Sequence, residues 1–114
     1  MDALPDATRS ALAPVLEASE RVERVVPAVG SSLVLTDRRL LVVREGASYR
    51  PRSGVRFWVL DRALTLRLAP ARRETARLEI ERSGRSASVF LAGEHVEEAR
   101  TLIAEIRSRT YAES

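Results

Sequence analysis

Few residues in this sequence have the chemistry that catalysis needs. His95 is the single imidazole and no cysteine is present, so a zinc site would need carboxylate ligands and a serine nucleophile would have one candidate base. No serine lies in a Gly-x-Ser-x-Gly turn, and no glycine-rich phosphate loop opens a helix. We expect a surface His95 and a non-enzyme with no cofactor, no metal site and no small-molecule substrate.

Two carboxylates have the spacing of a paired acid and base. Glu79 and Glu81 lie two residues apart in an alternating segment, which places both on one face of a strand. Like charges at this spacing usually mark the solvent face, where neither pKa is tuned for proton transfer. We interpret the pair as solvated.

Arginines of two predicted loops are the remaining candidates for binding. Arg50, Arg52 and Arg56 lie in and beside one loop, and Arg72 and Arg73 lie in another. Guanidinium groups form bidentate hydrogen bonds with phosphates and carboxylates. If the two loops come together, the five side chains would bind a phosphate, a phospholipid head or an acidic peptide; the alternative is that both loops are simply charged.

Charge is spread along the whole chain. The 19 basic residues are all arginine and alternate with 16 acids, which leaves a net charge of +3. This pattern predicts a mixed-sign surface and disfavours nucleic-acid binding. The apolar run Leu40–Val43 is far shorter than the roughly 20 residues that span a bilayer, and the acidic N-terminus is unlike a signal peptide. We expect a cytoplasmic protein, which the absence of cysteine allows.

The length of 114 residues fits one domain. We divide it into a helical lead-in over 1–19, a folded domain over 20–110 and a tail over 111–114. The pattern of Leu4–Glu17 predicts a short helix, which Pro14 would bend or break.

Seven short segments rich in β-branched residues follow, separated by turn residues. They are Val22–Val29, Leu33–Thr36, Arg39–Arg44, Val55–Leu60, Leu64–Leu68, Ala76–Arg82 and Ala87–Ala92. Pro27 indicates an edge strand or a bulge, and Asp37 with Arg38 forms a two-residue hairpin connection. We assign Gly30–Ser32 and Ser83–Gly84 to turns, 45–54 to a loop, and Trp58 to the core.

The period changes after Gly93. Apolar residues recur at helical spacing from Glu94 onward, with acids in the first turn and arginines in the last. The stripe comprises Val96, Ala99, Leu102, Ile103 and Ile106. We predict an amphipathic helix that covers one face or one end of the sheet.

The segment Leu33-Val-Leu-Thr-Asp-Arg-Arg-Leu-Leu-Val-Val43 is similar to the L-x-L-T-[ND]-x-R-[LI] hairpin of bacterial PH-like proteins, the GRAM-like branches of the pleckstrin-homology superfold. Leu4-Pro5 before a short helix resembles their lead-in. The resemblance covers about Arg21 to Arg109. It implies an α+β, mainly β fold: a partly open barrel of about seven antiparallel strands with a C-terminal capping helix.

The resemblance also implies a function class. We expect a non-catalytic interaction module that binds a protein partner, or itself, through a sheet edge, a loop rim or the outer face of the helix. The alternative is a peripheral membrane module that binds anionic lipid headgroups through the loop arginines. The connection between the first two strands, 28–32, has no positive charge, unlike the basic loop of phosphoinositide-binding relatives.

Overall fold

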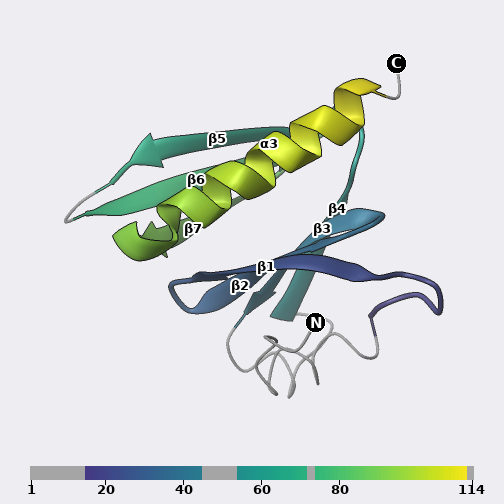
Figure 1. Cartoon of the computed structure of the whole chain (residues 1–114), viewed down its shortest axis with the longest axis horizontal. Helices are drawn as coiled ribbons and strands as arrows, with labels where there is room; N and C mark the ends of the chain where they lie inside the picture. Colours follow the sequence, from purple (N-terminus) through teal and green to yellow (C-terminus); the bar gives the residue numbers. More distant parts are fainter. Residues whose placement is uncertain (1–14, 45–53, 72–73, 113–114) are drawn as a thin grey trace.

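The computed structural model describes residues 15–44, 54–71 and 74–112, which form two antiparallel sheets and a C-terminal helix (Figure 1). One sheet has the order β1-β2-β3-β4 and the other the order β5-β6-β7. The strands are β1 Val22–Ala28, β2 Ser31–Thr36, β3 Arg39–Arg44, β4 Val55–Val59, β5 Thr65–Pro70, β6 Thr75–Arg82 and β7 Arg85–Ala92. All seven predicted strands are present, with ends shifted by at most two residues.

Three of the connections are two-residue turns. Asp37 and Arg38 join β2 to β3 as predicted, and Ser83 and Gly84, both at positive φ, join β6 to β7, as a type I′ turn requires. The predicted Gly30–Ser32 turn is wrong in its bounds. Gly30, at φ +70°, completes the turn directly after Val29, and the two serines instead pair with β1.

The main core lies between the sheets and under the helix. Trp58, as predicted, is buried there, and so are Leu66 of β5 and Ile80 of β6. The helix contributes Ala99, Leu102, Ile103 and Ile106, all buried. The predicted apolar stripe is therefore the face that closes the core.

A second apolar cluster covers the opposite face of the first sheet. Val34, Leu41 and Val43 are buried there, so β2 and β3 are apolar on both faces and read as nearly continuous hydrophobic runs rather than alternating ones. Val15 and Leu16 of the lead-in pack against this cluster. These two residues and Glu17 are not helical, so the predicted helix is wrong at this end; residues 4–14 of it lie outside the described residues, as do 45–53 of the predicted loop over 45–54.

The C-terminal helix begins later than predicted. Gly93–His95 forms a single 3-10 turn, and α3 runs from Val96 to Ala112. Gly93 lies so close to β6 that a Cβ atom built on it would be 2.7 Å from the carbonyl oxygen of Glu74. The chain therefore turns tightly against the sheet before α3 starts. No helix in the described part of the chain is long and apolar enough to cross a membrane.

The sheet edges are in different environments. The backbone N–H of Val29, just after β1, donates to the Phe90 carbonyl of β7 at 2.8 Å. From β4, Arg56 and Trp58 donate to the carbonyls of Ser86 and Arg85 at 2.9 and 3.4 Å. The edge of β1 thus lies against β7 and two side chains of β4 reach β7, whereas β5 pairs with no described strand except β6. The barrel remains open along β5, where α3 lies.

Candidate functional site

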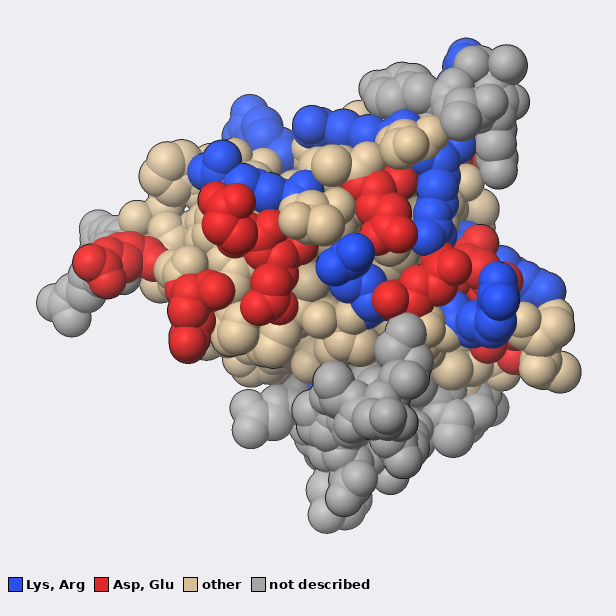
Figure 2. Space-filling view, in the orientation of Figure 1, with Lys and Arg blue, Asp and Glu red and all other residues tan. Residues whose placement is uncertain are grey.

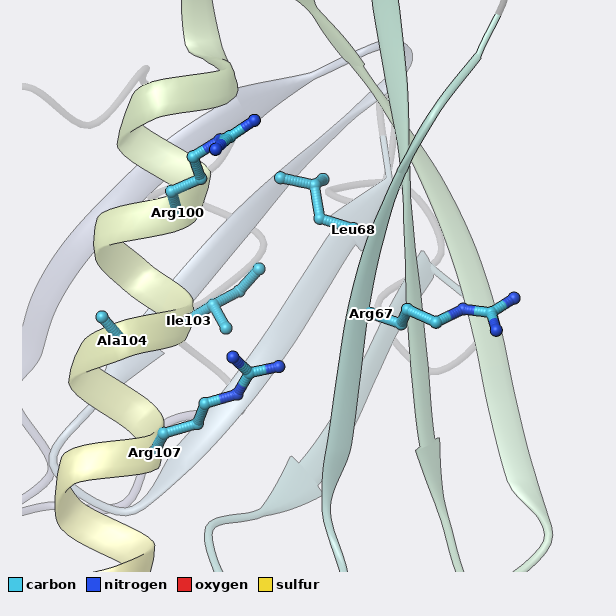
Figure 3. Close-up of a pocket in the computed structure, with 6 residues that line it drawn as sticks. All are labelled: Arg67, Leu68, Arg100, Ile103, Ala104 and Arg107. Carbon is cyan, nitrogen blue, oxygen red and sulfur yellow. The ribbon is translucent and has the colours of Figure 1, made fainter.

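A hollow of about 350 Å³ separates the edge of β5 from α3 (Figure 3). Its walls are Leu68 on the strand and Arg100, Ile103, Ala104 and Arg107 on the helix, with Arg67 at its border. The four helix residues recur at i, i+3, i+4 and i+7 and therefore share one flank of α3. We call this hollow and its two extensions, described next, the β5–α3 groove.

The groove continues along the full length of β5. A second hollow of about 380 Å³ adjoins Leu68 and Arg100 and extends to Pro70 and Val96. A third, of about 110 Å³, adjoins Arg107 and extends to Leu64 and Thr110. Because the beginning of α3 faces the end of β5, and the end of α3 faces its beginning, strand and helix run in opposite directions on either side of the groove.

The side chains at the groove point in two directions (Figure 3). Arg100, Ile103 and Arg107 extend from α3 toward the strand, and Leu68 extends toward the helix. Arg67 points away from α3 and pairs with Glu79 of β6 at 2.9 Å. The cationic groups that face the central hollow are therefore those of Arg100 and Arg107.

The strand edge presents backbone groups to the groove. Arg107 Nη2 donates to the Leu66 carbonyl at 3.0 Å, so that carbonyl points away from β6. Backbone groups of alternate residues point to the same side of a strand, which places those of Leu68 and Pro70 at the edge as well. Proline has no N–H to donate and is tolerated at such an edge. Leu66 and Leu68 supply the edge N–H groups.

The two ends of the groove differ in charge. Arg62 and Arg107 line the end near the start of β5, and Glu74 and Glu97 line the other end. Arg100, whose side chain is 65% exposed, lies between them at 3.6 Å from Glu97. No carboxylate lines the central hollow in the part of the chain described. The charged side chains that line this central hollow are all arginines, so its electrostatic potential is positive.

Sequence reasoning missed Arg100 and Arg107 as groove residues. The basic end of the helix was explained by the helix dipole alone. The available signal was the stripe Arg100, Ile103, Arg107, in which an apolar residue lies between two cations on one helix flank. That stripe becomes a binding surface only because α3 runs beside an open strand edge.

Of the five predicted loop arginines, Arg56 alone lies within the described residues; Arg50, Arg52, Arg72 and Arg73 lie outside them. Arg56 extends to Ser86, at the start of β7. The flank of the other loop, Thr75, pairs with Ala92 at the end of β7. The described flanks of the two loops are thus at opposite ends of one strand, and a binding role for the five arginines stays a prediction.

A hollow of about 370 Å³ lies where β1 and β4 meet β7. Arg44 and Arg56 contribute its positive charge, and it is lined also by Ser31 and Ser88. The apolar residues Val29 and Phe90 border it, 65% and 45% exposed. We call it the β1–β7 hollow. Phe90 and Val29 are two of the large apolar side chains that the described surface exposes.

The candidate acid, base and metal residues lie at the surface. Glu79 and Glu81 point outward, and Glu79 pairs with Arg67 and Arg77 at 2.9 and 3.0 Å, as expected for a solvated face. His95 lies in the 3-10 turn, 3.3 Å from Glu98. Among the described residues, no group of three His, Cys, Asp or Glu side chains is placed to hold a metal ion.

The conspicuous Thr-Asp-Arg-Arg turn of the hairpin binds the lead-in segment. Thr36 Oγ1 accepts the backbone N–H groups of Arg38 and Arg39 at 3.1 and 2.9 Å and donates to Glu20 Oε2 at 2.6 Å. Asp37 Oδ1 accepts the N–H of Arg21 at 2.8 Å. The polar groups of this turn therefore form hydrogen bonds that fix residues 15–21 to the hairpin.

The same turn places an ion pair in the interior. Arg39 pairs with Glu20, whose side chain is fully buried, and donates to the Val15 carbonyl at 3.1 Å. Its guanidinium also lies over the Phe57 ring, 4.8 Å from the centroid. The hydrogen bonds from Arg39 lower the pKa of Glu20 from 4.5 to about 2, because they favour the charged carboxylate more than burial disfavours it.

Basic and acidic side chains are mixed over the face on which α3 lies (Figure 2). Glu105 of α3 pairs with Arg24 of β1 at 2.9 Å and with Arg109 at 3.0 Å, and hydrogen bonding from Arg24 lowers the pKa of Glu105. Arg109 also pairs with Glu23 and donates to the Thr36 carbonyl at 3.2 Å. These contacts fix the second half of α3 to the first sheet and position Arg107 at β5.

No protein-family model and no curated protein matches the sequence. The structure is similar to the crystal structure of a pleckstrin homology domain from Shewanella amazonensis SB2B. The match has a TM-score of 0.57 and 20% sequence identity, and covers 89% of this chain and 97% of the other. With its two sheets of four and three strands, open along β5 and followed by one helix, the chain has the bacterial PH-like fold.

Proposed function

We propose that the protein is a non-catalytic, cytoplasmic interaction module that binds an extended segment of a protein partner along the edge of β5. The observation that carries the proposal is the open edge itself: Leu66 and Leu68 present backbone groups beside a groove with an apolar wall. An extended segment can add to such an edge through main-chain hydrogen bonds. A PH-like fold is consistent with an interaction module, and the sequence predicts no residue set for catalysis.

The test uses a neutral extended probe and the ¹⁵N-labelled protein. A hexapeptide of alternating valine and glutamine is titrated while amide signals are followed by NMR. Addition to β5 should shift the amides of Leu66 and Leu68 more than the outward amides of β1. The same peptide, N-methylated at the positions that would donate to β5, should leave these signals in place because its donors are removed. Equal shifts with both peptides would contradict strand addition.

Self-association through the same edge is a separate outcome of this design. Sedimentation of the protein alone over a range of concentrations reports it. If a dimer forms as the concentration rises, and the amide signals of Leu66 and Leu68 broaden with it, the occupant of the edge is a second copy of the chain and not a partner protein.

The β1–β7 hollow favours a second candidate, a peripheral module for anionic lipid. Val29, at the tip of a turn, is exposed beside Arg44 and Arg56, so an apolar tip and two cations face the same side. Basic residues near an anionic surface contribute about 1 kcal/mol each. Two arginines and one valine would therefore give weak, salt-sensitive binding.

Co-sedimentation with phosphatidylserine and phosphatidylcholine vesicles tests this candidate. Binding to the anionic vesicles that is lost on replacing Arg44 and Arg56 by serine would support it. The matched control replaces Arg67 and Arg77, which have the same charge but lie on the outer face of the other sheet. Equal loss in both double variants would mean that net charge, and not the hollow, determines binding.

A further inference from the structure

The β5–α3 groove combines a strand edge with a positive field. Its central hollow, of about 350 Å³, falls within the size of small ligand sites. Leu68 and Ile103 make its apolar surface, and Arg100 and Arg107 project into it from the helix (Figure 3). An occupant must therefore be extended, apolar on the side that meets Leu68 and Ile103, and negatively charged where it meets the guanidinium groups.

Arg107 has two roles at this edge. In the free protein it donates to the Leu66 carbonyl and so covers one acceptor of β5. Charged side chains beside an edge are a common protection against unwanted strand pairing. A carboxylate accepts a stronger hydrogen bond from a guanidinium than a neutral carbonyl does. A segment with a carboxylate at this position would draw Arg107 away from Leu66 and free that carbonyl for pairing.

Arg100 is available for the same interaction. Its nearest carboxylate is that of Glu97, at 3.6 Å on the exposed helix surface, and exposed i,i+3 pairs of this kind contribute only a few tenths of a kcal/mol. The Arg100 guanidinium can therefore turn toward a ligand at a small cost in free energy. Arg67 cannot, because its side chain lies on the opposite face of the sheet with Glu79.

We propose that the β5–α3 groove selects an extended acidic segment of a partner protein, with its carboxylates on Arg100 and Arg107 and its backbone on the edge of β5. This inference rests on the proposed function and adds the chemistry of the partner. Opposite charge at both cations gives the selectivity, and release of the Leu66 carbonyl by Arg107 links charge recognition to strand addition.

The test compares heptapeptides Thr-X-Thr-Val-Thr-X-Thr on the intact chain, with glutamate, glutamine or lysine at X, so that the valine and both X residues lie on one face of the added strand. The glutamate peptide should bind about tenfold more tightly than the glutamine peptide, since hydrogen bonds to charged groups contribute about 1.5–3 kcal/mol. The lysine peptide should bind least. Raising the salt concentration should narrow the differences. Affinity is read from the Leu66 and Leu68 amide shifts, so that site and strength are measured together.

Variants separate the two arginines from general charge. Arg100→Gln and Arg107→Gln together should remove the preference for glutamate and leave the neutral peptide bound. Arg67→Gln is the matched control, with the same loss of charge on the same strand but on its other face, and should keep the preference. Unchanged chemical shifts in the main core, notably at Ile80 and Leu78, confirm that each variant is folded.

The outcomes distinguish the two proposals. Equal affinity for glutamate and glutamine peptides at Leu66 and Leu68 would overturn the acidic selectivity and leave strand addition standing. An absence of any shift at these amides with every peptide would overturn both. Tighter binding of a polyuridine oligonucleotide or of phosphatidylserine vesicles at Arg100 and Arg107 would replace the acidic segment by another polyanion and overturn the inference.

Discussion

Glu20 and Arg39 form a buried ion pair that joins the segment before β1 to the β2–β3 hairpin. The Glu20 side chain is fully buried and that of Arg39 is 10% exposed. Each side chain forms a further hydrogen bond: the Thr36 hydroxyl donates to Glu20, and Arg39 donates to the carbonyl of Val15. A buried pair of this kind is costly to break from one side, because the remaining charge is left without a partner.

Acid should weaken the fold through Glu20. The folded-state pKa of about 2 lies below the 4.5 of the unfolded chain, so the stabilisation is present above about pH 4.5 and is lost as the pH falls through about 2. A shift of this size corresponds to about 3 kcal/mol at neutral pH. Urea unfolding of the wild type and Glu20→Gln should show a stability difference that narrows by about 2 kcal/mol between pH 7 and pH 3. A constant difference would contradict the role of Glu20.

Thr36→Val should destabilise the protein by about 2–3 kcal/mol, because the variant leaves two backbone donors and a buried carboxylate without the hydroxyl. Thr36→Ser keeps the hydroxyl and should cost less than about 1 kcal/mol. Denaturant midpoints at pH 7 measure both. Equal losses would show that the methyl group, and not the hydrogen bonds, stabilises the turn.

Gly93→Ala should lower the melting temperature, since the added Cβ would lie 2.7 Å from the Glu74 carbonyl oxygen and the backbone would have to move. Overpacking of this kind costs about 1–3 kcal/mol. Gly30→Asn is the control: no atom lies within 4 Å of a Cβ at that position, and asparagine tolerates its positive φ. A melting temperature unchanged in Gly93→Ala would mean that the 3-10 turn can shift freely.

Leu102→Ala should destabilise the protein by about 2–5 kcal/mol, because the side chain is fully buried in the main core and its removal leaves a cavity. Thr101→Ala, one position away on the exposed side of α3, should cost less than about 1 kcal/mol. Chemical denaturation followed by circular dichroism compares them. Similar losses of stability in both variants would show that α3 does not pack on the core through Leu102.

The strands and the final helix could be predicted because their signals are local. Leu64, Leu66 and Leu68 alternate with Thr65 and Arg67, and the structure buries the leucines and exposes the other two, with Leu68 partly covered. The signal for the β2–β3 hairpin is equally local, since a connection of two residues between two apolar segments allows few pairing registers of the strands. Among the described residues, the errors lie at the ends of elements: 15–17 are not helical, and Gly93–His95 forms a 3-10 turn before α3 begins.

The candidate site was harder to predict. The sequence drew attention to loop arginines because they are adjacent in the chain, whereas Arg100 and Arg107 are seven residues apart and face a strand some 40 positions earlier. Nothing local shows that β5 is an open edge; that depends on which strands the two sheets pair and on the end of β1 lying against β7. Residues brought together by topology carry no signal in a single sequence.

The sequence by itself determined the seven strands, the amphipathic helix and the buried Trp58, because alternation, turn residues and composition act over a few neighbouring residues. The tertiary structure decided which edge stays open, which helix flank faces it, and that the Thr-Asp-Arg-Arg turn binds Glu20, which precedes β1. Those features depend on the packing of two sheets and a helix, in which residues distant along the chain share one low-dielectric interior and compete for the same hydrogen bonds.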